Sequence, residues 1–170
     1  MSSVLNRTTK QFLTSVNTPD YDPAQWIIKP NLSAVGGIAQ KFWIVEGDSV
    51  RGMTDAEKIT LILPSDKGVL LERFSAEINE FIARHYSDGV QKTLTVLLVE
   101  AMGTKLYNRA AYIQKALNWV KSCLGYYYGR AAAVKAVTTF EGLAAISWDL
   151  APLDEVDPLV STAKVMGIPD

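Results

Sequence analysis

The hydrophobic pattern of the chain changes its period near Pro64, and this change constrains the fold more than any other feature. Before Pro64, short apolar runs alternate with turn-forming Gly, Pro, Asn and Asp residues, which is typical of short β-strands. From 65 to 147, apolar residues recur every three or four positions, which indicates helices. We therefore expect an α+β protein, with a small β-rich attachment module over 1–63 and a helical bundle with a C-terminal tail over 64–170.

The first part contains two segments that we expect to form strands, Gln25–Lys29 and Lys41–Glu46. The second is followed by the turn Gly47-Asp48 and can pair with residues 49–52 as a β-hairpin. Residues 4–16 are rich in Val and Thr but alternate only weakly, so we read them as an exposed strand or an extended arm.

An extended arm can add a strand to the edge of a neighbouring subunit's sheet. From this segment we assign Arg7, Lys10 and Phe12 as partner-binding residues. Trp26 and Trp43 lie on the two neighbouring candidate strands and are also assigned to partner binding, although they can instead form a small core for this part.

Helix caps mark the end of the first part and the whole of the second. Thr54-Asp55-Ala56-Glu57 predicts a capping box at the start of a short helix that ends at Pro64. Gly103 is expected as a C-terminal cap, and Gly129 as the end of a later helix. The pattern predicts about four longer helices, mostly antiparallel because their connections are short. We expect them at 65–85, 88–102, 108–129 and 130–147, followed by an extended acidic tail.

Composition excludes several classes of function. The net charge of −1 and the absence of a basic run argue against a nucleic-acid-binding protein. No stretch reaches the ~18 apolar residues of a membrane span, and no signal peptide is evident at the start, so we expect synthesis in a cytoplasm without export by these routes. Cys123 is the only cysteine, which excludes an internal disulfide and predicts a buried, unreactive thiol.

Candidate chemical groups are few. His85 is the only histidine, and it is expected to be structural, at the C-terminus of a helix. The acidic pair Glu77 and Glu80 is expected on a solvated face, and the cluster from Asp154 to Asp157 lacks the ligand spacing of a calcium loop. We therefore expect no catalytic residue, no metal site and no cofactor.

The run Tyr126-Tyr127-Tyr128 points in three directions on a helix, since successive residues are about 100° apart. One or two of these rings can pack into the core, and at least one should face outward. Exposed tyrosine is favoured at protein interfaces, so Tyr127 is assigned as a partner-binding residue, with core packing as the alternative.

Several segments together resemble virion structural proteins of tailed bacteriophages. In the first part these are the residues from Asp22 to Val35, from Lys41 to Asp48 and from Met53 to Lys58, with their Trp, Pro-Asn-Leu, Phe-Trp and Gly-Asp elements. In the second part they are Asn108-Arg109-Ala110-Ala111-Tyr112-Ile113, Trp119-Val120, the three tyrosines, Trp148-Asp149-Leu150 and Asp157-Pro158. None of these segments carries catalytic chemistry.

The resemblance implies a location in the virion and binding to other virion proteins, such as the major capsid protein or tail and fibre subunits. A homo-oligomer is expected, possibly a trimer, because such assemblies are symmetric. The small size and the absence of a fibrous repeat favour a capsid decoration or head-accessory protein, and head-fibre proteins are part of the same class. A tail, collar or fibre-attachment protein, a receptor-binding module and a small lytic enzyme are the alternatives.

Overall fold

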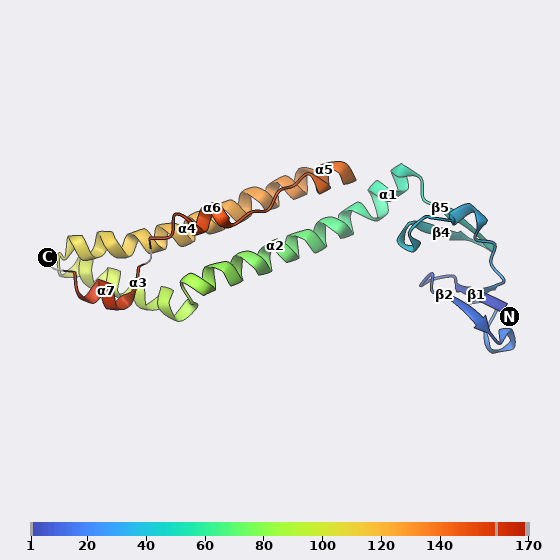
Figure 1. Ribbon diagram of the computed structural model, residues 1–170, viewed down its shortest axis with the longest axis horizontal. Helices are drawn as coiled ribbons and strands as arrows, with labels where there is room; N and C mark the ends of the chain where they lie inside the picture. Colours follow the sequence, from blue (N-terminus) through green and yellow to red (C-terminus); the bar gives the residue numbers. More distant parts are fainter. Residues whose placement is uncertain (1, 159, 169–170) are drawn as a thin grey trace. The chain divides into compact units, whose positions relative to one another are not determined.

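The computed structural model describes residues 2–158 and 160–168, which form two compact units divided between Ser65 and Asp66. This division lies two residues beyond the expected boundary at 63/64. The first unit contains small antiparallel sheets and the second is mostly helical, so the predicted α+β class is confirmed (Figure 1).

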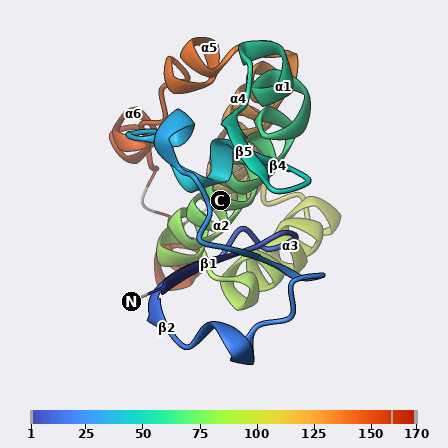
Figure 2. The same ribbon diagram turned by 90° about the vertical axis from the view of Figure 1, so that its right-hand side faces the viewer.

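The first unit contains two separate sheets, and in Figures 1 and 2 β1 and β2 belong to one of them and β4 and β5 to the other. The three-stranded sheet has β1 in its centre, and the other sheet is the expected hairpin of β4 and β5. The strands are β1 (Ser2–Asn6), β2 (Phe12–Val16), β3 (Trp26–Ile28), β4 (Trp43–Glu46) and β5 (Ser49–Gly52), with one-turn helices η1 (Thr18–Asp20), η2 (Ser33–Val35) and η3 (Gln40–Phe42).

The N-terminal segment is not an exposed arm. Val4 and Leu5 are both 0% exposed, because they are consecutive residues on opposite faces of the central strand β1. Leu5 packs in a small core with Ile27, Val35 and Val50. Within the segment 4–16, only β1 is buried on both faces. The second half forms the edge strand β2, which is partly exposed, so the expectation of an exposed strand holds there and the expectation of an extended arm is wrong.

The helices of the second unit, together with α1 at the end of the first, cover most of the remaining residues. They are α1 (Asp55–Leu61), α2 (Leu63–His85), α3 (Asp88–Gly103), α4 (Tyr107–Ala136), α5 (Phe140–Ala144), α6 (Ala151–Asp154) and α7 (Thr162–Met166). α3 packs antiparallel to the first half of α4, and side chains of α2 enter the same core (Figure 1).

Two expected helix ends and one expected cap in the helical part are wrong. Pro64 lies in the first turn of α2 and does not end the preceding helix, because a proline there loses no helical hydrogen bond. The 30-residue α4 continues through Gly129, and it has buried residues on both sides of this glycine: Cys123 before it, and Ala131 and Val134 after it. After α3 it is Lys105, with φ of 62°, and not Gly103 that adopts the left-handed conformation.

The core of the second unit joins α2, α3, α4 and the C-terminal segment. Its buried residues are Ile78, Phe81, Ile82, Tyr86, Leu94, Ile113, Ala116, Trp119, Cys123, Val160 and Val165. The C-terminal segment thus packs on the helices through Val160 and Val165. Cys123 is 0% exposed, as predicted, and burial raises the pKa of its thiol to about 11, which keeps it protonated and unreactive.

Candidate functional site

Arg7 joins three segments of the first unit. Its Nη2 lies 2.5 Å from Asp48 Oδ1, and its Nε and Nη2 donate to the Pro23 carbonyl at 3.2 and 3.1 Å. Its Nη1 donates to the Gly47 carbonyl. These contacts tie the end of β1 to the β4–β5 turn, so the structure accounts for Arg7 within the chain, and its role toward a partner stays a prediction.

Three of the predicted partner-binding residues are half-buried aromatic side chains of the first unit. Phe12 and Trp43 pack against its core, and Trp43 Nε1 donates to the Ile38 carbonyl at 2.8 Å. Trp26 meets the edge of Tyr21, with ring centroids 5.0 Å apart. Their packing shows a structural use for all three rings, and partner binding by them stays a prediction.

Lys10 lies in the connection between β1 and β2, where its φ is 60°. Its carbonyl accepts a hydrogen bond from Gln40 Nε2, which links this connection to η3. The backbone at Lys10 therefore has a structural role, and no contact described here tests its predicted binding of a partner.

The three consecutive tyrosines have different environments, as their helical spacing predicts. Tyr126 packs near Trp148, and its hydroxyl accepts a hydrogen bond from the Asp149 amide at 3.1 Å. Tyr127, the residue assigned to partner binding, is half-buried against the core of the second unit. Tyr128 is the outward-facing ring and is 64% exposed.

His85 holds the C-terminal segment against α2. Its Nδ1 lies 2.7 Å from Asp157 Oδ2, and its Nε2 lies 3.0 Å from Asp154 Oδ1. Tyr86 Oη donates to Asp157 Oδ1 at 2.8 Å and accepts from the Val160 amide at 2.9 Å. We call His85, Tyr86, Asp154 and Asp157 the C-terminal clasp.

The environment of the clasp is that of a structural contact. The Asp157 side chain is only 4% exposed, and burial together with the hydrogen bond to Asp157 raises the pKa of Tyr86 well above its usual value. Trp119 lies beside His85, with ring centroids 5.0 Å apart. Both ring nitrogens of His85 face carboxylates of the C-terminal segment, so its described polar contacts lie within the chain.

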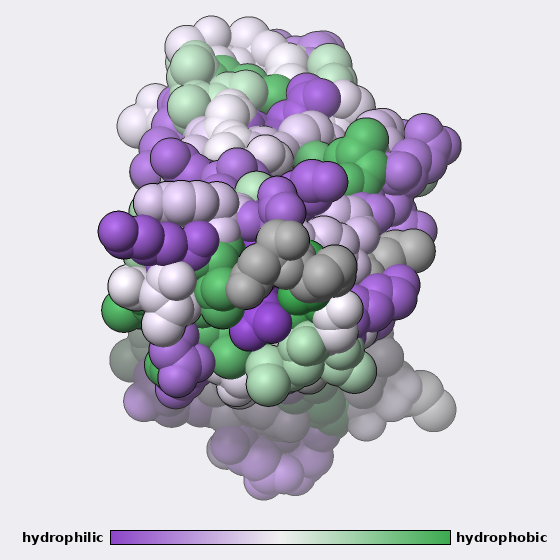
Figure 3. Space-filling model, turned by 90° about the vertical axis from the view of Figure 1, so that its left-hand side faces the viewer, coloured by the Kyte–Doolittle hydropathy of each residue, from purple (hydrophilic) through white to green (hydrophobic). Residues whose placement is uncertain are grey.

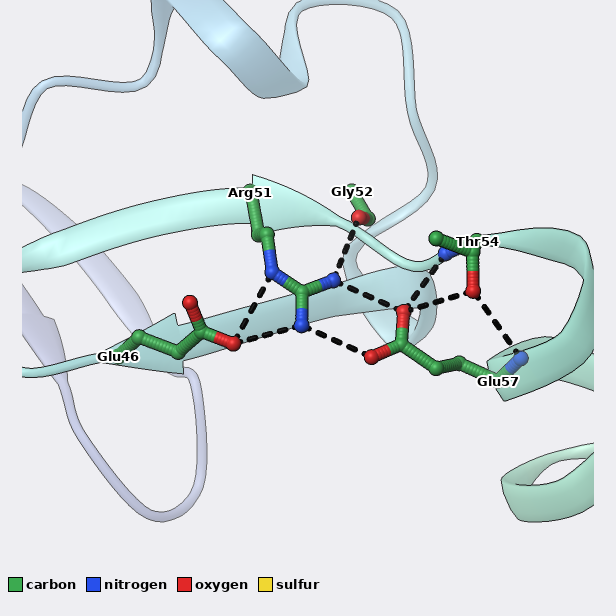
Figure 4. Close-up of polar contacts among 5 residues, drawn as sticks. All are labelled: Glu46, Arg51, Gly52, Thr54 and Glu57. Atoms are coloured by element: carbon green, nitrogen blue, oxygen red, sulfur yellow. Dashed lines mark hydrogen bonds and ion pairs between the residues drawn. The ribbon is translucent and has the colours of Figure 1, made fainter.

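A second polar network joins the β4–β5 hairpin to α1 (Figure 4). Arg51 Nε and Nη2 donate to Glu46 Oε1 at 3.0 and 2.6 Å, while Nη1 and Nη2 donate to the two carboxylate oxygens of Glu57 at 2.8 Å each. Glu57 also accepts from the Thr54 amide at 2.8 Å, which completes the predicted capping box.

The hydrogen bonds that Glu57 accepts lower the pKa of its carboxyl group. The donors from Arg51, followed by the Thr54 amide, lower the pKa of Glu57 to about 2. The carboxylate is therefore ionised at neutral pH and bound on both of its oxygens. This network fixes the start of α1 and offers no free acid or base.

The exposed face of α3 is unusually apolar. Val96 and Val99 are 64% and 69% exposed, and the sequence analysis assigned neither of them to a site. The neighbouring Thr93 and Thr95 donate their hydroxyls to the carbonyls of Gly89 and Gln91, at 2.9 and 2.8 Å. Because these hydroxyls are used within the helix, the threonines add little polarity to this face.

A hollow of about 250 Å³ lies between the end of α3 and the start of α4, next to this face. It is lined by Leu98, Met102, Tyr107, Ala110, Ala111 and Gln114. Met102 and Tyr107 are themselves exposed. Figure 3 looks onto this end of the second unit, where hydrophobic residues in green lie beside hydrophilic ones in purple. Exposed apolar surface of this kind is typical of protein–protein contacts.

The signal for this surface is present in the sequence of α3 but is easily missed. Leu94, Leu97, Leu98 and Ala101 already supply one apolar stripe for the core. Val96, Val99 and Met102 are additional apolar residues that a single buried stripe does not need. A helix that is apolar on more than one face has either a second buried face or an unpartnered one.

Comparisons with known proteins identify no relative of this chain. No protein-family model matches it, and neither a characterised protein nor a solved structure is similar to it. Over residues 2–158 and 160–168, none of the helices has the length and apolar character needed to cross a membrane. Over the same residues, His, Cys, Asp and Glu side chains do not gather in a group of three or more that could hold a metal ion.

Proposed function

We propose that this chain is a non-enzymatic structural protein of a tailed-bacteriophage particle, a capsid decoration or head-accessory protein that binds other virion subunits. The observation that carries the proposal is the exposed apolar surface over Val96, Val99, Met102 and Tyr107. Such a surface is suited to protein contacts, because burying it against another subunit removes apolar area from water. The resemblance of the segments around Trp26 and Trp43 to virion proteins supplies the biological setting.

The polar clusters of the two units support a non-enzymatic role. His85 is held by two carboxylates of the C-terminal segment, and Glu57 is held by Arg51 and Thr54. An enzyme of this size would need at least one ionisable group that is free to reach a substrate in a pocket. In both clusters the ionisable groups serve instead to join one segment of the chain to another.

In this proposal the first unit attaches the protein to the particle, and the second unit packs against symmetry-related copies or is displayed. Arg7, Lys10, Phe12, Trp26 and Trp43 remain the proposed attachment residues. Partial exposure leaves their outer edges free for a partner such as the major capsid protein. We expect the protein to be made in the host cytoplasm and then incorporated into virions.

Mass spectrometry of purified particles tests the proposal directly. We expect the chain to be present at a fixed copy number relative to the major capsid protein and to resist removal by washing. Its absence from purified particles would overturn the proposal. Immunogold labelling then distinguishes the location, because labels over heads support a decoration or accessory protein, whereas labels on the tail or collar support a fibre-attachment protein.

A receptor-binding role and a lytic role predict different results. Binding of the purified chain to a cell-surface glycan would favour the receptor-binding module. Turnover of cell-wall substrates that is lost in a His85→Ala variant would favour the enzyme, and it would contradict the structural role of His85 described above.

A further inference from the structure

We infer that the exposed face of α3 binds the same face of a second copy of this chain, in an antiparallel contact with two-fold symmetry centred on Val96. The contact surface, which we call the α3 seam, consists of Gly89, Lys92, Thr93, Val96, Val99, Glu100 and Gly103. This inference uses Val96 and Val99, which also carry the proposed function, but it needs only a second copy of the chain and no virion subunit. The partner is an identical chain, and the α3 helices of the two copies lie side by side.

The seam residues lie on one side of the helix. Taking about 100° per residue, all seven positions fall within about 60° on either side of Val96. All seven are exposed to solvent in the isolated chain. The core-facing residues Leu94 and Ala101 lie on the opposite side, so a partner can cover the seam without disturbing the core.

The order of residues along the seam is symmetric about Val96. In an antiparallel pair whose two-fold axis passes between the two Val96 residues, a residue n positions before Val96 in one copy lies at the level of the residue n positions after Val96 in the other copy. Gly89 would then face Gly103, and Thr93 would face Val99. Thr and Val have nearly the same shape, and the hydroxyl of Thr93 is already bonded to the Gly89 carbonyl.

Glycines at both ends of the seam permit a close approach of the two helices. A Cβ added at Gly103 would meet nothing within 4 Å, and one added at Gly89 would meet only the Ser87 hydroxyl at 4.0 Å. Neither glycine is therefore required by packing within the chain. In the paired arrangement both positions would lie against a second backbone, where small residues let helices approach closely.

Charge complementarity identifies a second copy as the occupant. Lys92 and Glu100 are each four residues from Val96, on opposite sides, so the two-fold arrangement puts Lys92 of each copy opposite Glu100 of the other. Among the residues described here, neither side chain forms an ion pair within its own chain. A parallel pair of α3 helices would instead place lysine beside lysine and glutamate beside glutamate.

Two further charged side chains lie close to the seam: Asp88, which precedes Gly89 at the start of α3, and Arg109 of α4. Arg109 and Glu100 line a second hollow, distinct from the one described above, and Arg109 Nη2 donates to the Ile168 carbonyl at 3.2 Å. Because α3 has only 16 residues, the contact is short, and interfaces of this size are weak. We expect a dimer that forms reversibly as the concentration of the protein rises.

Charge reversal in the full chain tests the contact. Sedimentation velocity over a concentration series should show a monomer–dimer equilibrium for the unaltered protein. Lys92→Glu and Glu100→Lys each replace two attractive pairs by two repulsive ones, and should raise the dissociation constant by about ten- to thirtyfold at low salt. The double variant Lys92→Glu/Glu100→Lys restores opposite charges and should return the dissociation constant to within about threefold of the original.

This design separates the contact from folding. Glutamate near the start of a helix and lysine near its end both suit the helix dipole. The glutamate introduced at position 92 lies four residues from Asp88, a like-charge spacing that weakly destabilises a helix, and circular dichroism checks that each variant keeps α3 folded. A monomeric unaltered protein, a trimer, or a double variant no tighter than the single ones would each overturn the inference.

A cross-linking experiment tests the position of the two-fold axis and is sensitive to weak dimers. Only a residue on the axis meets its own copy at the distance of a disulfide, so Val96→Cys should form a covalent dimer under mild oxidation. Thr95→Cys is the matched control, because this neighbouring residue is exposed but lies away from the seam. The native Cys123 is buried and should not contribute. Equal cross-linking of the two variants would contradict the proposed axis.

Discussion

Phe74 of α2 and Trp148 of the C-terminal segment stack face to face, with ring centroids 4.1 Å apart and an angle of 9° between their planes. Trp148 also contacts Tyr126 of α4, at a centroid distance of 5.4 Å. A single side chain of the C-terminal segment thus contacts both long helices. The segment that follows α5 therefore takes part in holding the helical unit together.

Trp148→Ala should lower the free energy of unfolding by about 2–4 kcal/mol, because it removes a large, half-buried ring from between two helices. Trp148→Phe is the matched control. The Nε1 of Trp148 is buried without a hydrogen-bond partner among the described residues, so phenylalanine keeps the stacking and removes an unsatisfied donor. Urea denaturation should therefore show a much smaller loss for Trp148→Phe. Equal losses would show that the stacking contributes little.

The clasp predicts a second stability effect, at the buried carboxylate of Asp157. Asp157 accepts from Tyr86 and contacts His85, and an asparagine offers only one acceptor oxygen in its place. Asp157→Asn should therefore cost about 1–3 kcal/mol of unfolding free energy. Asp154→Asn should cost less than about 0.5 kcal/mol, because this partner of His85 is 61% exposed. A larger loss for Asp154→Asn than for Asp157→Asn would contradict this ranking.

Sequence reasoning found the elements whose signals are local. The capping box of Thr54 and Glu57, the β4–β5 hairpin and the buried Cys123 all follow from neighbouring residues or from local hydrophobicity. The predictions were wrong for elements whose ends depend on contacts between residues far apart in the sequence. Gly129 is a helix breaker by propensity, but the burial of Ala131 and Val134 carries α4 through it.

In the candidate site, too, features with a local signal were predictable and features that depend on distant residues were not. Helical geometry predicted that at least one ring of the tyrosine run faces outward, but not which one, and the exposed residue is Tyr128. The partners of Arg7 lie 16 and 41 residues away along the chain, so nothing in its local sequence indicates that its guanidinium is used internally. The exposed face of α3 becomes visible only when its core-facing side has been identified.

The Arg51 network predicts the pH dependence of one carboxylate. The pKa of Glu57 in the folded state is about 2, below the ordinary value near 4.5, so the folded state binds this proton more weakly than the unfolded state. The stabilisation is therefore present above pH of about 4.5 and is lost as the pH falls toward 2. NMR titration of the Glu57 side chain should show a midpoint near 2 in the unaltered protein.

Arg51→Gln provides the comparison for this titration. Removing the guanidinium takes away the main cause of the shift, so the pKa of Glu57 should rise toward its ordinary value. The Thr54 amide still donates to Glu57 and should keep a smaller part of the shift. An unchanged midpoint in Arg51→Gln would show that the capping box alone controls Glu57.

The glycines of α4 predict gains in stability. Gly125 and Gly129 lie inside the helix, and a Cβ added at either position would meet nothing within 4 Å. Gly125→Ala and Gly129→Ala should each raise the unfolding free energy by about 0.5–1 kcal/mol, because alanine loses less conformational entropy in a helix. Gly47→Ala is the contrasting variant and should destabilise the β4–β5 hairpin, since Gly47 has φ of +61°. Thermal unfolding followed by circular dichroism measures all three, and a loss of stability in both α4 variants would indicate that α4 does not continue through these positions in solution.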